Sequence, residues 1–154
     1  MKQTKNISIA IITNILLCTS LISGNTVTVE ISYGELVDKI TILTIKSERI
    51  TNKEKLKNIQ TELETLQKAY DDYVGNRLDI TQLQKLLKKI NESLWDIEDA
   101  IRIKERNKEF DDEFTEIARS VYTTNDERCA IKKKIDLLLG SHITEEKSYE
   151  EFTA

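Results

Sequence analysis

The apolar residues of this chain recur at steps of three and four along four stretches, which is the spacing of amphipathic helices. The first stretch runs from about Tyr33 to Ile50. It follows Ser32 and Glu35, which match a capping box, where two side chains satisfy the free N–H groups of a helix start. Apolar residues cover much of its circumference, so we predict that this helix is the central and most buried one.

The second and third stretches carry uninterrupted heptad seams. The second opens at a capping box of Thr51 and Glu54, and Gly75 and Asn76 end it. Its seam comprises Leu56, Ile59, Leu63, Leu66, Tyr70 and Tyr73. The third helix extends to about Lys108. Its seam comprises Leu83, Leu87, Ile90, Leu94, Ile97 and Ile101. Two such seams with a short connection are typical of an antiparallel pair, so we predict a long protruding coiled-coil-like hairpin from Thr51 to Lys108.

The fourth stretch predicts a helix that starts after Asp111 or Asp112 and ends at Leu139, before Gly140. Its seam is Phe114, Ile117, Val121, Thr124, Arg128, Ile131, Ile135 and Leu138. Arg128 interrupts this seam, and a buried guanidinium without a partner is too costly to be incidental. Either this part of the bundle opens to water, or Arg128 faces a carboxylate from another helix or an anionic ligand.

Together these stretches predict an all-α protein, an antiparallel bundle of about four helices. We place the helical bundle domain at residues 29–140 and a C-terminal tail at residues 141–154. The composition agrees, because the 154 residues contain no proline, four glycines and 32% charged residues. The net charge of -4 argues against nonspecific nucleic-acid binding.

Familiar catalytic and metal-binding patterns are not found in the sequence. Cys18 and Cys129 give neither a disulfide framework nor a zinc ligand set, and the single histidine, His142, follows the last predicted helix. Glycine-rich phosphate loops and His-Glu-x-x-His motifs do not occur. We therefore predict no cofactor, no metal and no catalytic residue.

A set of polar side chains is nevertheless predicted to gather where the helices pack. The candidate ligand-binding residues are Asp38, Lys39, Lys46, Glu98, Arg102, Asn125, Asp126, Arg128 and Lys132. Such a cluster can bind a small anion, with its acids orienting the cations. The favoured interpretation is that these charges pair across helices without a ligand, with Glu98 or Asp126 as the partner of Arg128.

Three runs of the sequence resemble a known family. They are Ile31–Leu43, with Ser-x-Gly-Glu-Leu-x-Asp-Lys-Ile-Thr-Ile-Leu; Leu94–Asp99; and Ala118–Lys132, with Val-Tyr-x-x-Asn-Asp-x-Arg. They are similar to the signature runs of a small bacterial and phage-associated family of uncharacterised helical proteins, over about Val29 to Tyr149. The resemblance implies an association with glycosyltransferases and surface-polysaccharide genes, and a start a few residues before the Ser-x-Gly-Glu run.

The first 24 residues have two interpretations. Lys2 and Lys5, an apolar run over residues 7–17 and Cys18-Thr19-Ser20 are typical of an export signal. Alternatively, this stretch is a spurious N-terminal extension, and the true start lies near Val27 or Val29. It is too short and too polar for a stable membrane span. The resemblance favours a cytoplasmic location, with export as the alternative.

Two functions remain open at this level. The leading hypothesis is a non-enzymatic helical interaction module, in which the hairpin from Thr51 to Lys108 pairs with itself or with a protein partner. The alternative is a small helical enzyme or binding protein for an anionic metabolite, with a charged pocket like that of chorismate mutases.

Overall fold

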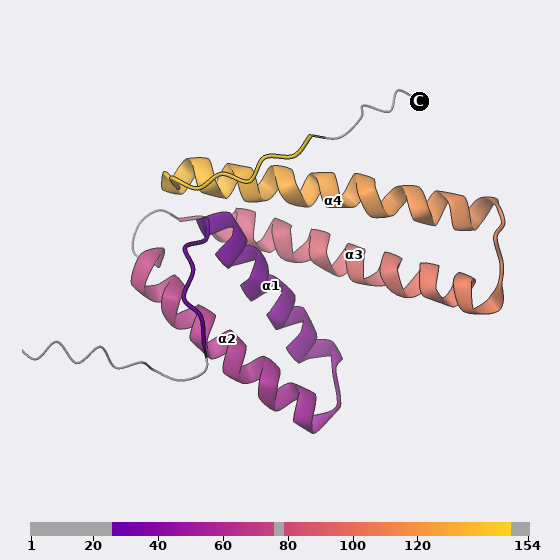
Figure 1. The fold of residues 1–154 in the computed structure, drawn as a ribbon, viewed down its shortest axis with the longest axis horizontal. Coiled ribbons are helices and arrows are strands. Elements are labelled where there is room, and N and C mark those ends of the chain that lie inside the picture. Colours follow the sequence, from indigo (N-terminus) through magenta and orange to yellow (C-terminus); the bar gives the residue numbers. More distant parts are fainter. Residues whose placement is uncertain (1–25, 76–78, 149–154) are drawn as a thin grey trace, which may run out of the picture.

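The computed structural model describes residues 26–75 and 79–148. These residues form four α-helices: α1 (Tyr33–Arg49), α2 (Lys53–Tyr73), α3 (Thr81–Asn107) and α4 (Asp112–Leu139). Figure 1 shows that the helices run antiparallel in two pairs, one of α1 and α2 and one of α3 and α4. The prediction of an all-α, four-helix bundle is thus confirmed. The proposed export signal, residues 1–24, lies outside the described residues.

Most helix ends lie where the sequence predicts them. Ser32 caps α1 by accepting a hydrogen bond from the Glu35 amide at 3.1 Å, and Gly140 ends α4 with a φ of 65°. The start of α2 differs from the prediction. Asn52, not Thr51, is its N-cap and accepts a hydrogen bond from the Lys55 amide at 3.0 Å. An asparagine one residue further along takes over the capping position.

The predicted hairpin from Thr51 to Lys108 is wrong. Over the described residues α2 and α3 do not contact each other; α1 packs against α2, α3 and α4, and α3 packs against α4. The connections explain this pairing, since only residues 50–52 join α1 to α2 and only residues 108–111 join α3 to α4. A heptad seam shows that a helix needs an apolar partner, but it does not specify which helix that partner is.

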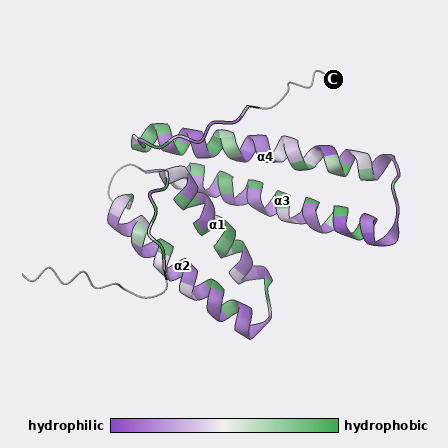
Figure 2. Cartoon of the chain, viewed as in Figure 1, coloured by the Kyte–Doolittle hydropathy of each residue, from purple (hydrophilic) through white to green (hydrophobic). Residues whose placement is uncertain are grey.

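The hydrophobic core lies where α1 meets the other three helices. Its centre holds Val37 of α1, Leu87 of α3 and Ile135 of α4, each 0% exposed. Figure 2 shows that hydrophobic and hydrophilic residues alternate along these helices, and α1 packs against each of the other three. α1 is therefore the central helix, as predicted.

Two apolar residues of the predicted seams are exposed. Leu138 is 54% exposed, whereas its neighbour Leu139 is only 2% exposed, and Tyr73 is 65% exposed at the end of α2. Leu138 follows Ile135 by three residues and Leu139 follows it by four, and both steps keep a residue near one face of a helix. The position of α1 therefore decides which of the two leucines is buried.

The far ends of α3 and α4 project beyond α1 and α2 (Figure 1). Residues 95–126 include this projecting part, and we call them the arm. A protruding hairpin therefore exists, although α3 and α4 form it instead of α2 and α3. None of the helices within the described residues is long and apolar enough to cross a membrane.

Candidate functional site

Arg128 pairs with Asp38, an acid that α1 supplies. The Nε of Arg128 donates to both carboxylate oxygens, at 3.0 and 3.2 Å, and its terminal nitrogen donates to Oδ2. The Asp38 side chain is only 1% exposed, and that of Arg128 is 26% exposed. The hydrogen bond to Asp38 outweighs burial and raises the pKa of Arg128, so the guanidinium stays charged. The expected carboxylate from another helix is present, but it is neither Glu98 nor Asp126.

The buried Asp38 has a second donor on α3. The amide nitrogen of Asn91 donates to Asp38 Oδ1 at 2.8 Å and to the Thr41 hydroxyl at 2.9 Å. The Thr41 hydroxyl in turn donates to the backbone carbonyl of Asp38 at 2.8 Å. This network joins α1, α3 and α4 through polar groups that are nearly all satisfied inside the protein.

A second junction lies where the start of α1 meets α4. The amide of Gly34 donates to Asp136 Oδ1 at 2.6 Å, so an acid from α4 satisfies a free N–H in the first turn of α1. The two backbones are close: a β-carbon at Gly34 would lie 2.5 Å from the carbonyl oxygen of Lys132. Only glycine permits this approach.

Lys132 is a buried ion-pair centre. Its Nζ donates to Glu35 at 2.7 Å and to Glu145 at 2.6 Å. Burial alone would lower the pKa of Lys132, but the hydrogen bonds to Glu145 and Glu35 more than offset it, so the pKa is raised. The same contact with Lys132 lowers the pKa of Glu145. The spacing of Glu35 and Lys39 suggests an intrahelical pair, yet Glu35 pairs with Lys132 of another helix.

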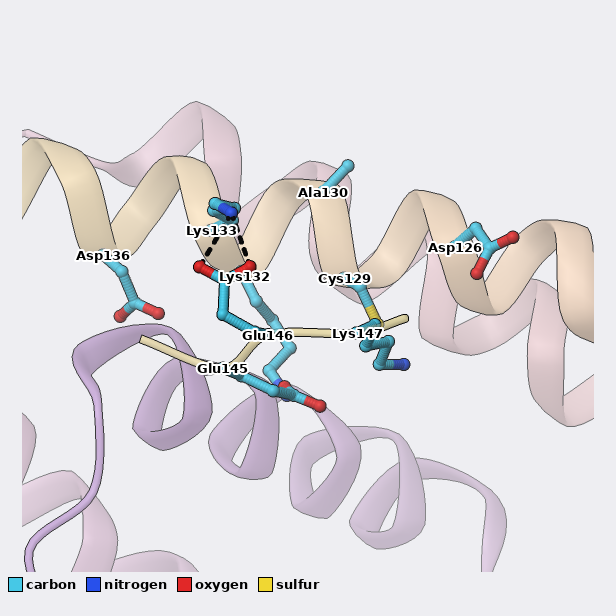
Figure 3. Close-up of a pocket in the computed structure, with 9 residues that line it drawn as sticks. All are labelled: Asp126, Cys129, Ala130, Lys132, Lys133, Asp136, Glu145, Glu146 and Lys147. Carbon is cyan, nitrogen blue, oxygen red and sulfur yellow. Dashed lines mark hydrogen bonds and ion pairs between the residues drawn. The ribbon is translucent and has the colours of Figure 1, made fainter. Parts of the chain in front are cut away.

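The segment after α4 folds back along that helix. It covers a small cavity of about 240 Å³ beside Cys129. In Figure 3, Glu145 points toward Lys132, and Glu146 is joined to Lys133 of α4. The described part of the predicted tail, residues 141–148, is thus attached to the bundle by ion pairs, and we call residues 143–147 the strap.

A larger groove of about 650 Å³ lies between α3 and α4 at the base of the arm. Ile42, Asn91, Leu94, Trp95, Glu98, Asp99, Arg102, Val121, Tyr122, Asn125 and Arg128 line it. Trp95 is held by Arg49, whose guanidinium lies 5.6 Å from the ring centroid and also pairs with Asp96. The groove therefore has apolar and aromatic walls with polar groups among them.

The structure divides the nine predicted site residues among several places. Glu98, Arg102, Asn125 and Arg128 line the groove, with Asp38 behind Arg128. Lys132 and Asp126 line the strap cavity instead. Lys39 is exposed and Lys46 is half-buried, and neither lines these two cavities.

The nine residues therefore do not line one cavity, and their binding of an anion stays a prediction. The cations that are buried or line the groove already have carboxylate partners, because Arg102 donates to Glu98 at 2.7 Å while Arg128 and Lys132 pair as described. The run Lys132–Lys134 is also not one solvated face, since Lys132 is only 6% exposed.

Three residues important at these junctions were not predicted: Thr41, Asn91 and Asp136. A signal for Asn91 was present, because it lies four residues after Leu87 and three before Leu94, on the apolar face of its helix. The sequence could not identify Asp38 as its partner, since α1 reaches that face of α3 only in the folded bundle. Within residues 26–75 and 79–148, no three His, Cys, Asp or Glu side chains lie together in a way that could hold a metal ion.

Comparison with known proteins places the chain in a family. Neither the curated proteins nor the solved structures contain a match. Residues 27–153, by contrast, match the family described as a family of unknown function, DUF6165, and this match includes α1 to α4 and the strap. The chain belongs to the DUF6165 family.

Proposed function

We propose that this protein is a non-enzymatic helical interaction module and that the arm is its docking element. The observation that carries the proposal is a gradient of burial along the α3–α4 pair. Near α1 the seam residues Leu87 and Ile90 are buried, at 0% and 8% exposed. In the arm, the seam residues Ile97 and Ile101 of α3 are only half-buried.

Exposed apolar side chains add to this surface. Ile103 is 48% exposed, Phe110 is 59% exposed and Tyr122 is 40% exposed, and all three belong to the arm. Two helices alone cannot cover the seam between them, so a third or fourth helix from a partner would complete the packing. An exposed apolar surface of this kind is typical of an interaction site.

The likeness to proteins associated with glycosyltransferases and surface-polysaccharide genes supports the biological setting we propose. In that setting the partner is a protein of such a system, and the module contributes contacts, with no chemistry of its own. The ion pairs of Arg102, Arg128 and Lys132 favour this role, because each of these cations already has a carboxylate partner.

The test compares two exposed apolar residues at opposite ends of the α3–α4 pair. Ile103→Glu alters the arm, and Leu137→Glu, at a residue that is 72% exposed, alters the other end of α4. We expect Ile103→Glu to abolish self-association in sedimentation, or partner recovery in pulldown from the native host, and Leu137→Glu to preserve it. A wild-type monomer at high concentration with no recovered partner would contradict the proposal.

The second candidate is a binding protein or small enzyme for an anionic metabolite. The volume of the groove, about 650 Å³, and the arginines in its lining favour it. A thermal-shift screen with phosphorylated sugars, nucleotide sugars and dicarboxylates separates the two functions. Saturable stabilisation would support the second candidate, and its absence would support the interaction module.

A further inference from the structure

The groove at the base of the arm differs from an anion site in its charge. Of its two cations, Arg102 is paired with Glu98, and Arg128 is paired with the buried Asp38. Asp99, which also lines the groove, is exposed and forms no ion pair with the other described residues. With the buried Asp38 counted, the groove therefore has three acids and two bases.

The surrounding arm has the same sign. Residues 95–126 contain ten acids and five bases, so the arm is strongly acidic. Its bases are largely occupied, since Lys104 contacts Asp111 and Glu113, and Arg119 contacts Glu116. A partner that approaches this surface meets a negative potential, which steers a positively charged surface toward it.

The shape of the groove fits a helix. On α3 its lining extends from Asn91 to Arg102, about three helical turns or roughly 17 Å. On α4 it extends from Val121 to Arg128, about two turns or roughly 10 Å. A helix lying between α3 and α4 places two or three side chains along such a length. The apolar walls formed by Ile42, Trp95 and Val121 would receive them.

We infer that the groove binds a basic amphipathic helix of a partner protein. Apolar side chains of that helix enter between Trp95 and Val121, and its lysines or arginines face Asp99 and the acidic arm. This inference rests on the proposed function and deepens it by naming the chemistry of the partner. The acidity of the arm disfavours a second copy of the same arm as the occupant, because two acidic surfaces repel each other.

Trp95 provides a direct readout, because it is the only tryptophan in the chain. The probe is a helical peptide of leucine and lysine with leucines at steps of three and four. Its control is the same peptide with glutamate in place of lysine. We expect the lysine peptide to shift the Trp95 emission to shorter wavelength with saturation, and the glutamate peptide to leave it unchanged. Added salt should weaken the binding.

Two matched charge reversals locate the site. Asp99→Lys changes the groove, whereas Asp72→Lys changes the net charge equally at an exposed residue of α2. We expect Asp99→Lys to raise the Kd for the lysine peptide about tenfold and Asp72→Lys to leave this Kd nearly unchanged.

Several results would overturn the inference. They are equal binding of both peptides, binding of neither, equal effects of both variants, and a concentration-dependent Trp95 shift without peptide, which would indicate a second copy. The Ile103→Glu experiment judges the proposed function separately, because Ile103 does not line the groove. If Ile103→Glu loses association while the wild type binds neither peptide, the interaction module is supported and only the inference of a basic helix is refuted.

Discussion

The guanidinium of Arg128 on α4 holds the carboxylate of Asp38 on α1, with its Nε 3.0 and 3.2 Å from the two oxygens. The pair explains why a charged residue stands in the apolar seam of α4. It also sets the register of three helices, because Asn91 of α3 shares the same carboxylate. Arg128 therefore has a structural role whether or not a ligand enters the adjoining groove.

Replacing Arg128 tests this role directly. Arg128→Met keeps much of the side-chain volume but leaves the buried Asp38 without its cation, so we expect a loss of about 3 to 5 kcal/mol in the free energy of unfolding. The double variant Asp38→Leu with Arg128→Met should recover much of that loss, because no buried charge then remains unpaired. Denaturant melts measure both. A single variant as stable as the wild type would refute the structural role and favour an anion site.

Gly34→Ala tests the close approach of α1 to α4. The added β-carbon would lie 2.5 Å from the Lys132 carbonyl oxygen, and a backbone atom cannot turn away as a side chain can. We expect destabilisation of about 1 to 3 kcal/mol in thermal or denaturant melts. Gly75→Ala is the control, because its nearest atoms are 3.4 Å away, and it should change stability by less than about 0.5 kcal/mol. Equal losses of stability in both variants would show that the close contact with Lys132 is not the cause.

Asp136 should stabilise the start of α1 through its side-chain oxygen. Asp136→Ala leaves the amide of Gly34 without its 2.6 Å acceptor and should cost about 1 to 3 kcal/mol. Asp136→Asn keeps an oxygen at that position, so it should lose less. Hydrogen exchange provides a local readout, since the Gly34 amide should exchange faster in the alanine variant than in the asparagine variant. Unchanged protection in both would contradict the capping role.

The strap should depend on pH through Glu145 and Lys132. Because Lys132 lowers the pKa of Glu145 from its ordinary 4.5, the stabilisation by this pair is complete above that pH and is lost as the pH falls through the lower folded-state pKa. The pKa of Lys132 is raised from 10.5, so at alkaline pH the stabilisation is lost only as the pH rises through the raised value.

Glu145→Gln measures this contribution. The Glu145 side chain is 48% exposed, so the expected loss at neutral pH is only about 0.5 kcal/mol. The difference between wild type and variant in the free energy of unfolding should disappear in acid. A difference that is the same at pH 7 and in acid would show that the ion pair is not its source.

Two truncations of seam residues distinguish core from docking surface. Leu87→Ala, at a residue that is 0% exposed, should cost about 3 kcal/mol or more in stability. Ile101→Ala, in the half-buried arm, should cost about 1 kcal/mol and weaken partner association more than Leu87→Ala does. Equal losses of stability would indicate that the arm is part of the core.

The sequence by itself determined the local structure. The spacing of apolar residues placed four helices, and Ser32, Asp111 and Gly140 cap three helix ends as predicted, because capping depends on residues close in the sequence. The interruption at Arg128 also showed that this part of the bundle either opens to water or places a carboxylate or an anion opposite the guanidinium, since the cost of an unpaired buried charge does not depend on the fold.

Only the tertiary structure decided which helices pair and which groups meet. The seams of α2 and α3 resemble each other, and each can pack on any apolar helix, so the pattern could not exclude the wrong hairpin. Asp38 and Arg128 are 90 residues apart, and Gly34 and Asp136 are 102 apart, distances over which sequence spacing carries no information. Their contacts follow from how α1 crosses α3 and α4, and that crossing is set by the packing of the whole core.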